Sequence, residues 1–254
     1  MSQFSLKLLA LICMLCDHFS KVVLSSGVLT HAFGFEADLW LRTMLEVVGR
    51  IAFPIFAWFT AEGCHKTRAP GKYILRLGIF AVISEIPFQF CFYGAGYQGI
   101  RFACHNVIFT MLLGAVAIIC SEKLKELKIP DAMAVMVPSV VAVALGWFLH
   151  TDYNAWGVAL IICLYYLPRE RDRLVFLLCW ITVFMLIWHG WNGEMLVWLS
   201  GNNDYRLLLQ WVGALFSAAF LASYNGEKGR GAKWLFYVFY PLHLTVLYLI
   251  RLCI

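Results

Sequence analysis

The sequence predicts an all-α, polytopic membrane protein, and three observations lead to this fold class. The 254 residues are 62% hydrophobic and only 14% charged, whereas soluble domains are roughly half apolar and about a quarter charged. The mean hydropathy is +0.76. The apolar residues also come in runs long enough for a helix to cross a bilayer. A water-soluble enzyme, a nucleic-acid-binding protein and a disordered protein are therefore poor interpretations, because too few charges remain to cover an exterior.

About nine apolar runs are bounded by charges or turn residues, and we expect each to form a membrane helix. A bilayer core about 30 Å thick needs roughly 20 helical residues, so the short fourth and sixth runs are expected to be thin, tilted or re-entrant. The predicted spans are Leu6 to Leu29, Met44 to Glu62, Tyr73 to Tyr93, Asn106 to Cys120, Ala132 to Leu149, Ala155 to Leu167, Leu174 to Trp188, Leu207 to Tyr224 and Trp234 to Leu252. No repeat or long linker divides the chain, so one membrane domain over residues 1–254 is predicted.

Alternate loops between these runs are basic. By the positive-inside rule the basic loops are cytoplasmic, which places the N-terminus inside and, for nine spans, the C-terminus outside. The basic loops hold Lys66, Arg68, Lys72 and Arg76; Lys123, Lys125 and Lys128; Arg169, Arg171 and Arg173; and Lys228, Arg230 and Lys233. The intervening loops hold only Arg42, Arg101 and Arg206.

The first predicted span contains four ionisable residues, Lys7, Asp17, His18 and Lys21. Each ionisable group at membrane depth costs at least about 2.5 kcal/mol, so each needs a partner or a function. Lys7 and His18 are eleven residues apart, or three helical turns, and share one helix face. Asp17 and Lys21 have the i, i+4 spacing of an ion pair, which is equally well explained as structural. We expect His18 to be functional, because a histidine beside a carboxylate within the membrane is rarely accidental.

The second span holds Glu46 and Arg50, again with i, i+4 spacing, so a structural ion pair is a serious alternative to a functional role. Gly49 and Pro54 flank Arg50, and they permit close approach of another helix and a kink. At 1.5 Å per residue the predicted depths of Arg50 and His18 are compatible.

Further candidates lie toward the predicted outer half of the membrane. Asn106 opens the fourth span, Asp152 occupies an outer loop, and His243 follows Pro241 in the last span. Together they converge on one depth. Glu85, in the third span, is interpreted as a pairing residue first and a site residue second. The nine cysteines are scattered and odd in number, so we expect neither a disulfide framework nor a metal site, and the Cys13 and Cys16 pair is interpreted as helix packing.

Several motifs resemble the TraX family, whose namesake acetylates a conjugative pilin subunit. They are the CDH of the first span, GRIAFPIFAW with the following EG and basic loop, SEIPF, NVIFTMLLG, DYNAWG, YNG and FYPLHL. The resemblance runs from about Lys7 to Leu244. More distantly, the spacing from Lys7 to His18 is similar to a pattern of membrane O-acyltransferases that modify sugars, many of which carry arginine at the first position.

The resemblance implies acetyl transfer from cytosolic acetyl-CoA to an amine or hydroxyl acceptor, either a pilin-like protein or a glycan. Acyl transfer needs a base and a donor for the oxyanion. His18 suits the base, Asp17 suits a group that orients it, and Arg50, Asn106 or His243 suit the oxyanion donor. Lys7, Glu46 and Asp152 are further candidates for binding the substrates, and the loop with Lys66, Arg68, Lys72 and Arg76 is a candidate for binding the nucleotide of coenzyme A.

The implied location is the bacterial cytoplasmic membrane, with lipid as a partner and without a nucleic-acid partner or a metal. Two other functions fit the same residues. A transporter could use Asp17, Lys21, Glu46 and Arg50 as a proton or substrate relay, although no inverted repeat is visible. A non-catalytic assembly factor for conjugation could instead hold a membrane-embedded precursor by helix packing.

Overall fold

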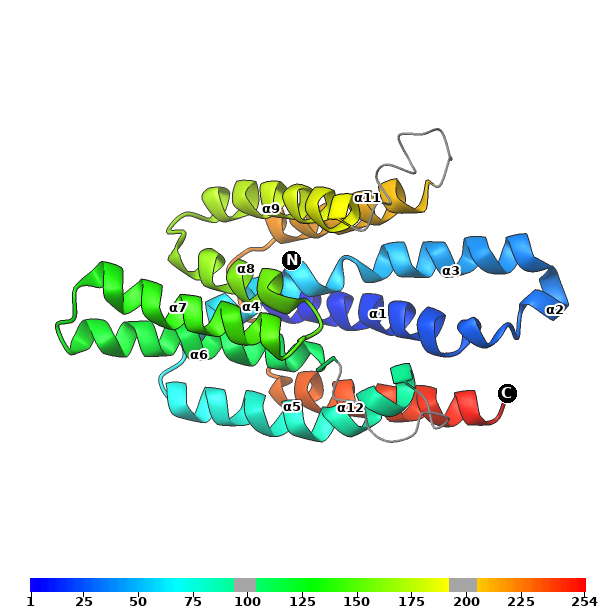
Figure 1. Cartoon of the computed structure of the whole chain (residues 1–254), viewed down its shortest axis with the longest axis horizontal. Helices are drawn as coiled ribbons and strands as arrows, with labels where there is room; N and C mark the ends of the chain where they lie inside the picture. Colours follow the sequence, from blue (N-terminus) through cyan, green and yellow to red (C-terminus); the bar gives the residue numbers. More distant parts are fainter. Residues whose placement is uncertain (94–103, 192–204) are drawn as a thin grey trace. The chain divides into compact units, whose positions relative to one another are not determined.

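The computed structural model describes residues 1–93, 104–191 and 205–254, and within them every named element is a helix (Figure 1). One isolated bridge joins His105 and Thr151. The elements are α1 (Gln3–Val22), η1 (Leu24–Ser26), α2 (Thr30–Phe33), α3 (Phe35–Gly49), α4 (Ala52–Lys66), α5 (Pro70–Tyr93), α6 (Val107–Glu126), α7 (Asp131–Phe148), α8 (Asn154–Tyr166), α9 (Glu170–Trp191), α11 (Arg206–Ala222) and α12 (Lys233–Leu252). The all-α prediction is confirmed.

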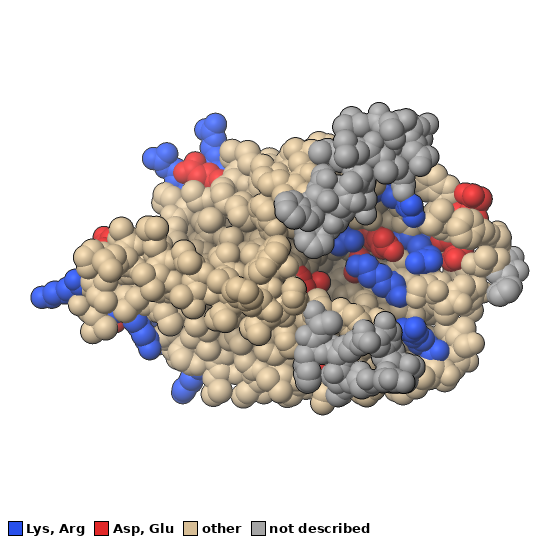
Figure 2. Space-filling model, viewed as in Figure 1, with Lys and Arg blue, Asp and Glu red and all other residues tan. Residues whose placement is uncertain are grey.

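Length and composition make this a membrane helix bundle. Within the described residues, six segments are long and apolar enough to cross a bilayer: Gln3–Ser26, Phe35–Lys66, Pro70–Tyr93, Val107–Glu126, Asp131–Phe148 and Trp234–Leu252. Helices α8 and α11 are shorter but apolar. One side of α7 exposes Met133, Met136 and Val140, an apolar face that lipid would cover. On the face shown in Figure 2, the surface over α6 and α7 has almost no charged atoms. Lysine or arginine side chains, in blue, project near the turn that joins the two helices.

Three spans differ most from their predicted limits. The first α-helix ends at Val22 rather than Leu29, and the chain then turns through Gly27, whose φ of 80° is left-handed. The fourth span is not short, because α6 continues past Cys120 to Glu126. Its last turn contains lysines, whose long side chains can reach the interface from within a helix. The second span starts earlier, at Phe35, and is interrupted at Arg50 and Ile51.

The described residues form two compact units. Unit 1 comprises Met1–Phe56, Arg169–Ala232 and Leu249–Ile254, and unit 2 comprises Ala57–Pro168 and Lys233–Tyr248. Each unit is described by itself below. That both function as one domain stays a prediction.

In unit 1, α3 packs against both α1 and α11, and α11 packs against α9. Gly213 makes the α3 and α11 contact possible, since a Cβ there would overlap the carbonyl oxygen of Val47. The N-terminus of α1 is capped by Ser2, whose hydroxyl accepts from the Ser5 amide at 3.3 Å. The Gln3 amide donates to the Glu227 carbonyl at 2.8 Å, so the loop that follows α11 lies beside the start of α1.

In unit 2, α6 packs against α5, α7 and α8. Gly114 of α6 lies so close to Ile161 of α8 that a Cβ would come within 2.8 Å of its side chain. Helix α12 packs on α5 through ring pairs, among them Phe80 with Tyr237 at 5.1 Å between centroids. Small residues at the crossings and aromatic pairs are typical of helix packing without a hydrophobic driving force.

Contacts between loops agree with the predicted alternation of sides. In unit 1, the N-terminus meets the basic loop after α11. In unit 2, the His65 ring contacts the Tyr165 carbonyl at 3.0 Å, and the His105 amide donates to the His150 carbonyl at 3.0 Å. Each contact joins two segments that the sequence assigns to the same side. Which side faces the cytosol stays a prediction from the positive-inside rule.

Candidate functional site

The polar residues of α1 face the interior of unit 1. Asp17, His18 and Ser20 are buried, with His18 only 7% exposed, whereas Leu8, Ile12 and Leu15 are exposed. Helical periodicity explains this division, because residues three and four apart lie on the same face. His18 therefore lies on the buried face of α1. Lys7 is half-buried at the other end of the same helix.

Asp17 is held by charge more than by hydrogen bonds. Its Oδ2 accepts from Lys21 Nζ at 2.7 Å, which confirms the predicted pair. Its Oδ1 is buried without a hydrogen-bond partner among the described residues. The positive charges of Lys21 and Arg50, and His18 beside it, all act on this carboxylate. We call Asp17, His18, Lys21 and Arg50 the Asp17 cluster.

Close packing of α1 against α3 brings this cluster together. A Cβ on Gly49 would overlap Asp17 Cβ and lie 2.8 Å from Asp17 Oδ1. The interruption of the helix at Arg50 follows directly, before Pro54 in the first turn of α4, and proline in that turn cannot donate a backbone hydrogen bond. The close approach predicted from Gly49 is thus confirmed, and the kink predicted near Pro54 takes the form of a helix break at Arg50 and Ile51.

Glu46 also faces α1, one turn from Arg50. Its Oε1 accepts from Ser20 Oγ at 3.5 Å, and the same hydroxyl lies 3.2 Å from the Arg42 carbonyl. The predicted ion pair between Glu46 and Arg50 stays a prediction. Unit 1 therefore gathers Asp17, His18 and Glu46 with Arg50 at the α1 and α3 interface.

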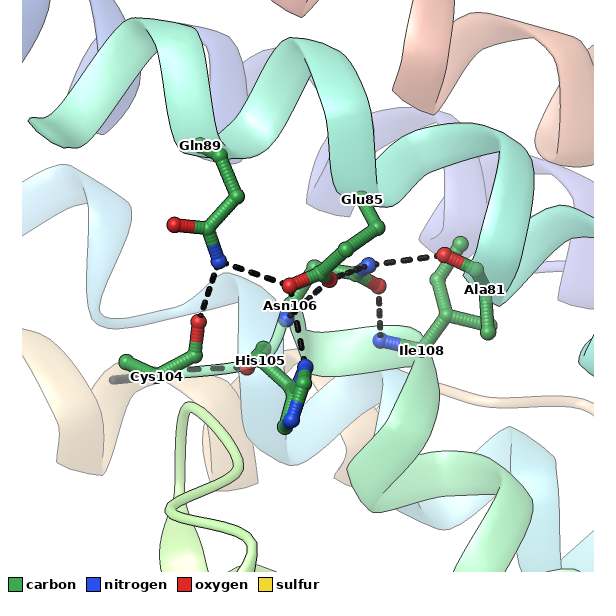
Figure 3. Close-up of polar contacts among 7 residues, drawn as sticks. All are labelled: Ala81, Glu85, Gln89, Cys104, His105, Asn106 and Ile108. Carbon is green, nitrogen blue, oxygen red and sulfur yellow. Dashed lines mark hydrogen bonds and ion pairs between the residues drawn. The ribbon is translucent and has the colours of Figure 1, made fainter. Parts of the chain in front are cut away.

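A second polar cluster lies in unit 2, where α5 meets the start of α6 (Figure 3). Glu85 is 7% exposed, and its carboxylate points toward the segment that precedes α6. Oε1 accepts from Gln89 Nε2 at 2.7 Å and from His105 Nδ1 at 2.9 Å. Oε2 accepts from Asn106 Nδ2 at 2.6 Å and from the Asn106 amide at 3.2 Å. We call Glu85, Gln89, His105 and Asn106 the Glu85 cluster.

Asn106 has a structural role: it caps α6 and connects this helix to α5. Its side-chain oxygen caps α6 by accepting from the Ile108 amide at 3.1 Å, and its side-chain nitrogen donates to Glu85 and to the Ala81 carbonyl at 2.9 Å. Since both amide hydrogens are already used, this arrangement does not favour Asn106 as an oxyanion donor.

Sequence reasoning did not single out His105 or Gln89, and it treated Glu85 mainly as a pairing residue. The sequence held one local indication. Asparagine is a preferred N-cap residue, so Asn106 indicates the start of a helix and places His105 directly before it. The spacing of Glu85 and Gln89 also places both on one face of α5. The meeting of these two segments depends on tertiary structure.

The remaining predicted site residues of unit 2 lie in different settings. The Asp152 amide donates to the His105 carbonyl at 2.8 Å, and its side chain is exposed. His243 of α12 is buried, with Nδ1 2.8 Å from the Phe239 carbonyl and its ring stacked on Phe239. Asp152 thus adjoins the Glu85 cluster, whereas His243 contacts its own helix.

The basic turn between α4 and α5 is accessible. Lys66, Arg68 and Lys72 are exposed and Arg76 is half-buried. Lys66 pairs with Glu62, one turn earlier in α4. Exposed cations of this kind suit the phosphates of a nucleotide, and they equally satisfy the topology rule. Across the part of the chain that the structure describes, no three His, Cys, Asp or Glu side chains gather as metal ligands.

Comparison with known proteins places these residues in a family. The family described as "TraX protein" matches residues 2–251. The chain is 27% identical over 258 residues to "Probable fimbrial assembly protein FimC, serogroup H1" of Dichelobacter nodosus, covering 97% of this chain and 94% of that protein. It is 23% identical over 197 residues to "Uncharacterized protein RP591" of Rickettsia prowazekii (strain Madrid E), covering 76% and 74%. No solved structure shows a significant match.

Proposed function

We propose that this chain, which belongs to the TraX family, transfers an acetyl group from acetyl-CoA to an amine or hydroxyl acceptor at the cytoplasmic membrane of a bacterium. The observation that carries the proposal is the inward burial of His18 beside Asp17 and within reach of the charge of Arg50. A relative named for fimbrial assembly favours an acceptor that is a pilin-like protein, and a glycan is the other acceptor class.

In the proposed reaction His18 acts as the general base. The acceptor oxygen or nitrogen attacks the thioester carbonyl, its proton passes to the imidazole, the C–S bond breaks, and the proton moves on to the thiolate of coenzyme A. Arg50 donates to the oxyanion that forms on the carbonyl. Asp17 balances the positive charge that His18 gains, and its Oδ1 still has acceptor capacity in the described structure.

The donor enters from the cytosol in this proposal. The exposed side chains of Lys66, Arg68 and Lys72, with Arg76, suit the phosphates of coenzyme A, because phosphate binding relies on positive charge and N–H donors. Lys7 of α1 and Glu46 of α3 are proposed to bind the substrates.

The direct test uses the purified protein in lipid nanodiscs with acetyl-CoA and a pilin-like peptide. We expect release of free coenzyme A thiol, reduced about 10²–10⁴-fold in His18→Ala, which is the usual contribution of a general base. His150→Ala is the matched control, since His150 is exposed in the turn between α7 and α8. Release that does not exceed the His18→Ala background for any peptide or glycan acceptor would overturn the proposal.

The name of the Dichelobacter relative also favours a second function, that of a non-catalytic assembly factor. In that case His18→Ala leaves pilus assembly intact, whereas changes on exposed apolar helix faces such as that of α7 abolish it. Assembly measured in cells for both kinds of variant separates the two functions.

A further inference from the structure

A stacked pair of rings joins α4 and α8 in unit 2. The rings of His65 and Tyr165 lie with their centroids 3.9 Å apart and their planes at 13°. The imidazole is also held by Nε2, which donates to the Tyr165 carbonyl oxygen at 3.0 Å, since a carbonyl can only accept. His65 is exposed and Tyr165 is half-buried. The pair is therefore a flat aromatic surface that is held in one orientation and reaches solvent.

Contacts with α6 hold the tyrosine end of this pair. The Tyr165 and Tyr166 rings meet edge to face at 5.0 Å. The Tyr166 hydroxyl lies 3.4 Å from Glu122 Oε1, which also accepts from Lys125 Nζ at 2.9 Å. The same ammonium group lies 4.8 Å from the centre of the Tyr166 ring. Three helices thus fix the ring pair before any ligand binds, which lowers the entropic cost of binding.

Cations lie next to the ring pair along the chain. Lys66 directly follows His65, and Arg68 and Lys72 come in the following turn and at the start of α5. All three cations are exposed. Lys66 pairs with Glu62, whereas Arg68 and Lys72 form no ion pair with the described residues. Positive charge that is not already neutralised favours a ligand with phosphate groups.

A fixed aromatic surface beside such cations suits a nucleotide. A base of any identity can stack on an aromatic ring, histidine included, while its phosphates bind exposed lysine and arginine side chains. The positive charges alone would equally satisfy the topology rule. The ring pair is the feature that the topology rule does not require, and it favours a ligand with a base.

We propose that the His65 and Tyr165 pair binds the adenine base of coenzyme A, and that Arg68 and Lys72 bind its phosphates. The base stacks on the exposed side of the His65 ring, and Tyr165 is the positioning residue that holds this ring. Stacking does not select one base, so the identity of the nucleotide rests on the acetyl transfer proposed above. All four residues lie in unit 2.

The test measures binding of adenosine 3′,5′-bisphosphate to the full-length protein in phosphatidylcholine nanodiscs by isothermal titration calorimetry. This probe carries the base of coenzyme A without the thioester arm, so it binds without any acetyl transfer. Pyrophosphate, in a second titration, reports on phosphate binding without a base. We expect saturable binding of the nucleotide, and its absence would overturn the proposal.

Two substitutions of His65 separate stacking from structural support. His65→Gln keeps a donor for the Tyr165 carbonyl but loses the ring. It should raise the dissociation constant of the nucleotide about tenfold, a usual effect of losing one stacked base, and leave that of pyrophosphate unchanged. His65→Phe keeps a ring but loses the hydrogen bond, and it should retain nucleotide binding. The opposite order of the two variants, or equal weakening of both ligands in His65→Gln, contradicts the site.

Two further variants complete the set. Arg68→Gln should weaken the nucleotide and pyrophosphate alike, because both ligands need the phosphate contact; an unchanged affinity for both would exclude Arg68 from the site. His150→Ala is the matched control, since this exposed histidine lies in the turn between α7 and α8, and it should bind both ligands as the unmodified protein does.

Kinetics separate this site from the proposed acetyl transfer. If transfer occurs, His65→Gln should lower kcat/KM for acetyl-CoA about tenfold and leave that for S-acetylpantetheine, which lacks the nucleotide, unchanged. Transfer with the same kcat/KM for acetyl-CoA in both proteins would overturn the nucleotide site alone. Nucleotide binding that weakens in His65→Gln, without transfer to any acceptor, would instead overturn the acetyl transfer alone.

Discussion

Asp17 in unit 1 and Glu85 in unit 2 are both buried carboxylates on apolar helices, with side chains that are only 12% and 10% exposed. They are satisfied in different ways. Asp17 has one salt bridge, to Lys21, and an Oδ1 without a hydrogen bond in the described structure. Glu85 accepts four hydrogen bonds, and its neighbour His105 is its only titratable partner among them.

The difference shows two uses of a buried charge in a membrane helix. Cations balance Asp17 and leave its Oδ1 without a hydrogen bond in the described structure, which suits the charge-balancing role proposed for it beside His18. N–H donors saturate Glu85, so it connects α5 to the start of α6 and orients one ring. Substitution and labelling of the residues in both clusters distinguish these two arrangements.

Glu85→Ala should cost about 3–5 kcal/mol of unfolding free energy, the range for removing one partner from a buried charged network. It leaves the buried donors of Asn106 and Gln89 without their acceptor. Unfolding in mixed micelles by titration with SDS measures the loss. Glu122→Ala is the control, since its pair with Lys125 is partly exposed and such pairs contribute less than about 1 kcal/mol. Equal losses in the two variants would contradict the conclusion that Glu85 connects α5 to the start of α6.

Cys104 reports whether the Glu85 cluster excludes water. Burial, assisted by the charge of Asp152, raises the pKa of its thiol from 9.0 to about 11. At pH 8 iodoacetamide should therefore alkylate Cys104 about 100-fold more slowly in the folded than in the SDS-unfolded protein, because the thiolate is the nucleophile. The rate should rise about tenfold per pH unit up to pH 10.

The raised pKa of the Cys104 thiol also makes the stability of the folded protein depend on pH. The folded protein holds this proton more tightly, so Cys104 contributes stability that is complete below pH 9 and lost as the pH rises toward 11. Alkylation at the unfolded rate at pH 8 would show that the cluster is open to water.

Gly49→Ala should cost about 1–3 kcal/mol, the usual penalty for overpacking. The new Cβ would overlap Asp17 and separate α1 from α3. Gly78→Ala is the matched control on α5, because its nearest neighbour is a Leu112 methyl group at 4.0 Å; it should be neutral or stabilising by up to about 1 kcal/mol, as alanine favours helix. If the two variants unfold alike, the α1 and α3 contact is not as close as described.

Asp17→Asn should have the smallest effect, about 1 kcal/mol, because asparagine keeps the shape of the side chain and can still accept from the one-third exposed Lys21, although the charge that faces Arg50 and His18 is lost. Glu85→Gln should cost clearly more under the same conditions, since it places an amide N–H group against other donors. A larger loss for Asp17→Asn than for Glu85→Gln would reverse the contrast between the two carboxylates.

The apolar runs, their charge boundaries and the i, i+4 pair of Asp17 with Lys21 were predictable, because in lipid each helix satisfies its own backbone hydrogen bonds. Helix ends were less predictable. The first helix stops at Val22 through a turn at Gly27, and the fourth continues through its lysines. Such limits depend on local turns and on side chains that reach the interface, which hydropathy does not record.

The membrane class and the order of the helices follow from the amino-acid sequence, because long apolar runs and the cost of charge in lipid dictate both. The close contact of Gly49 with Asp17, and the hydrogen bonds of Glu85 with His105 and Asn106, 20 and 21 residues further along the chain, come from helix packing instead. These contacts join separate segments, and only the packing of one helix on another brings their side chains within hydrogen-bond distance.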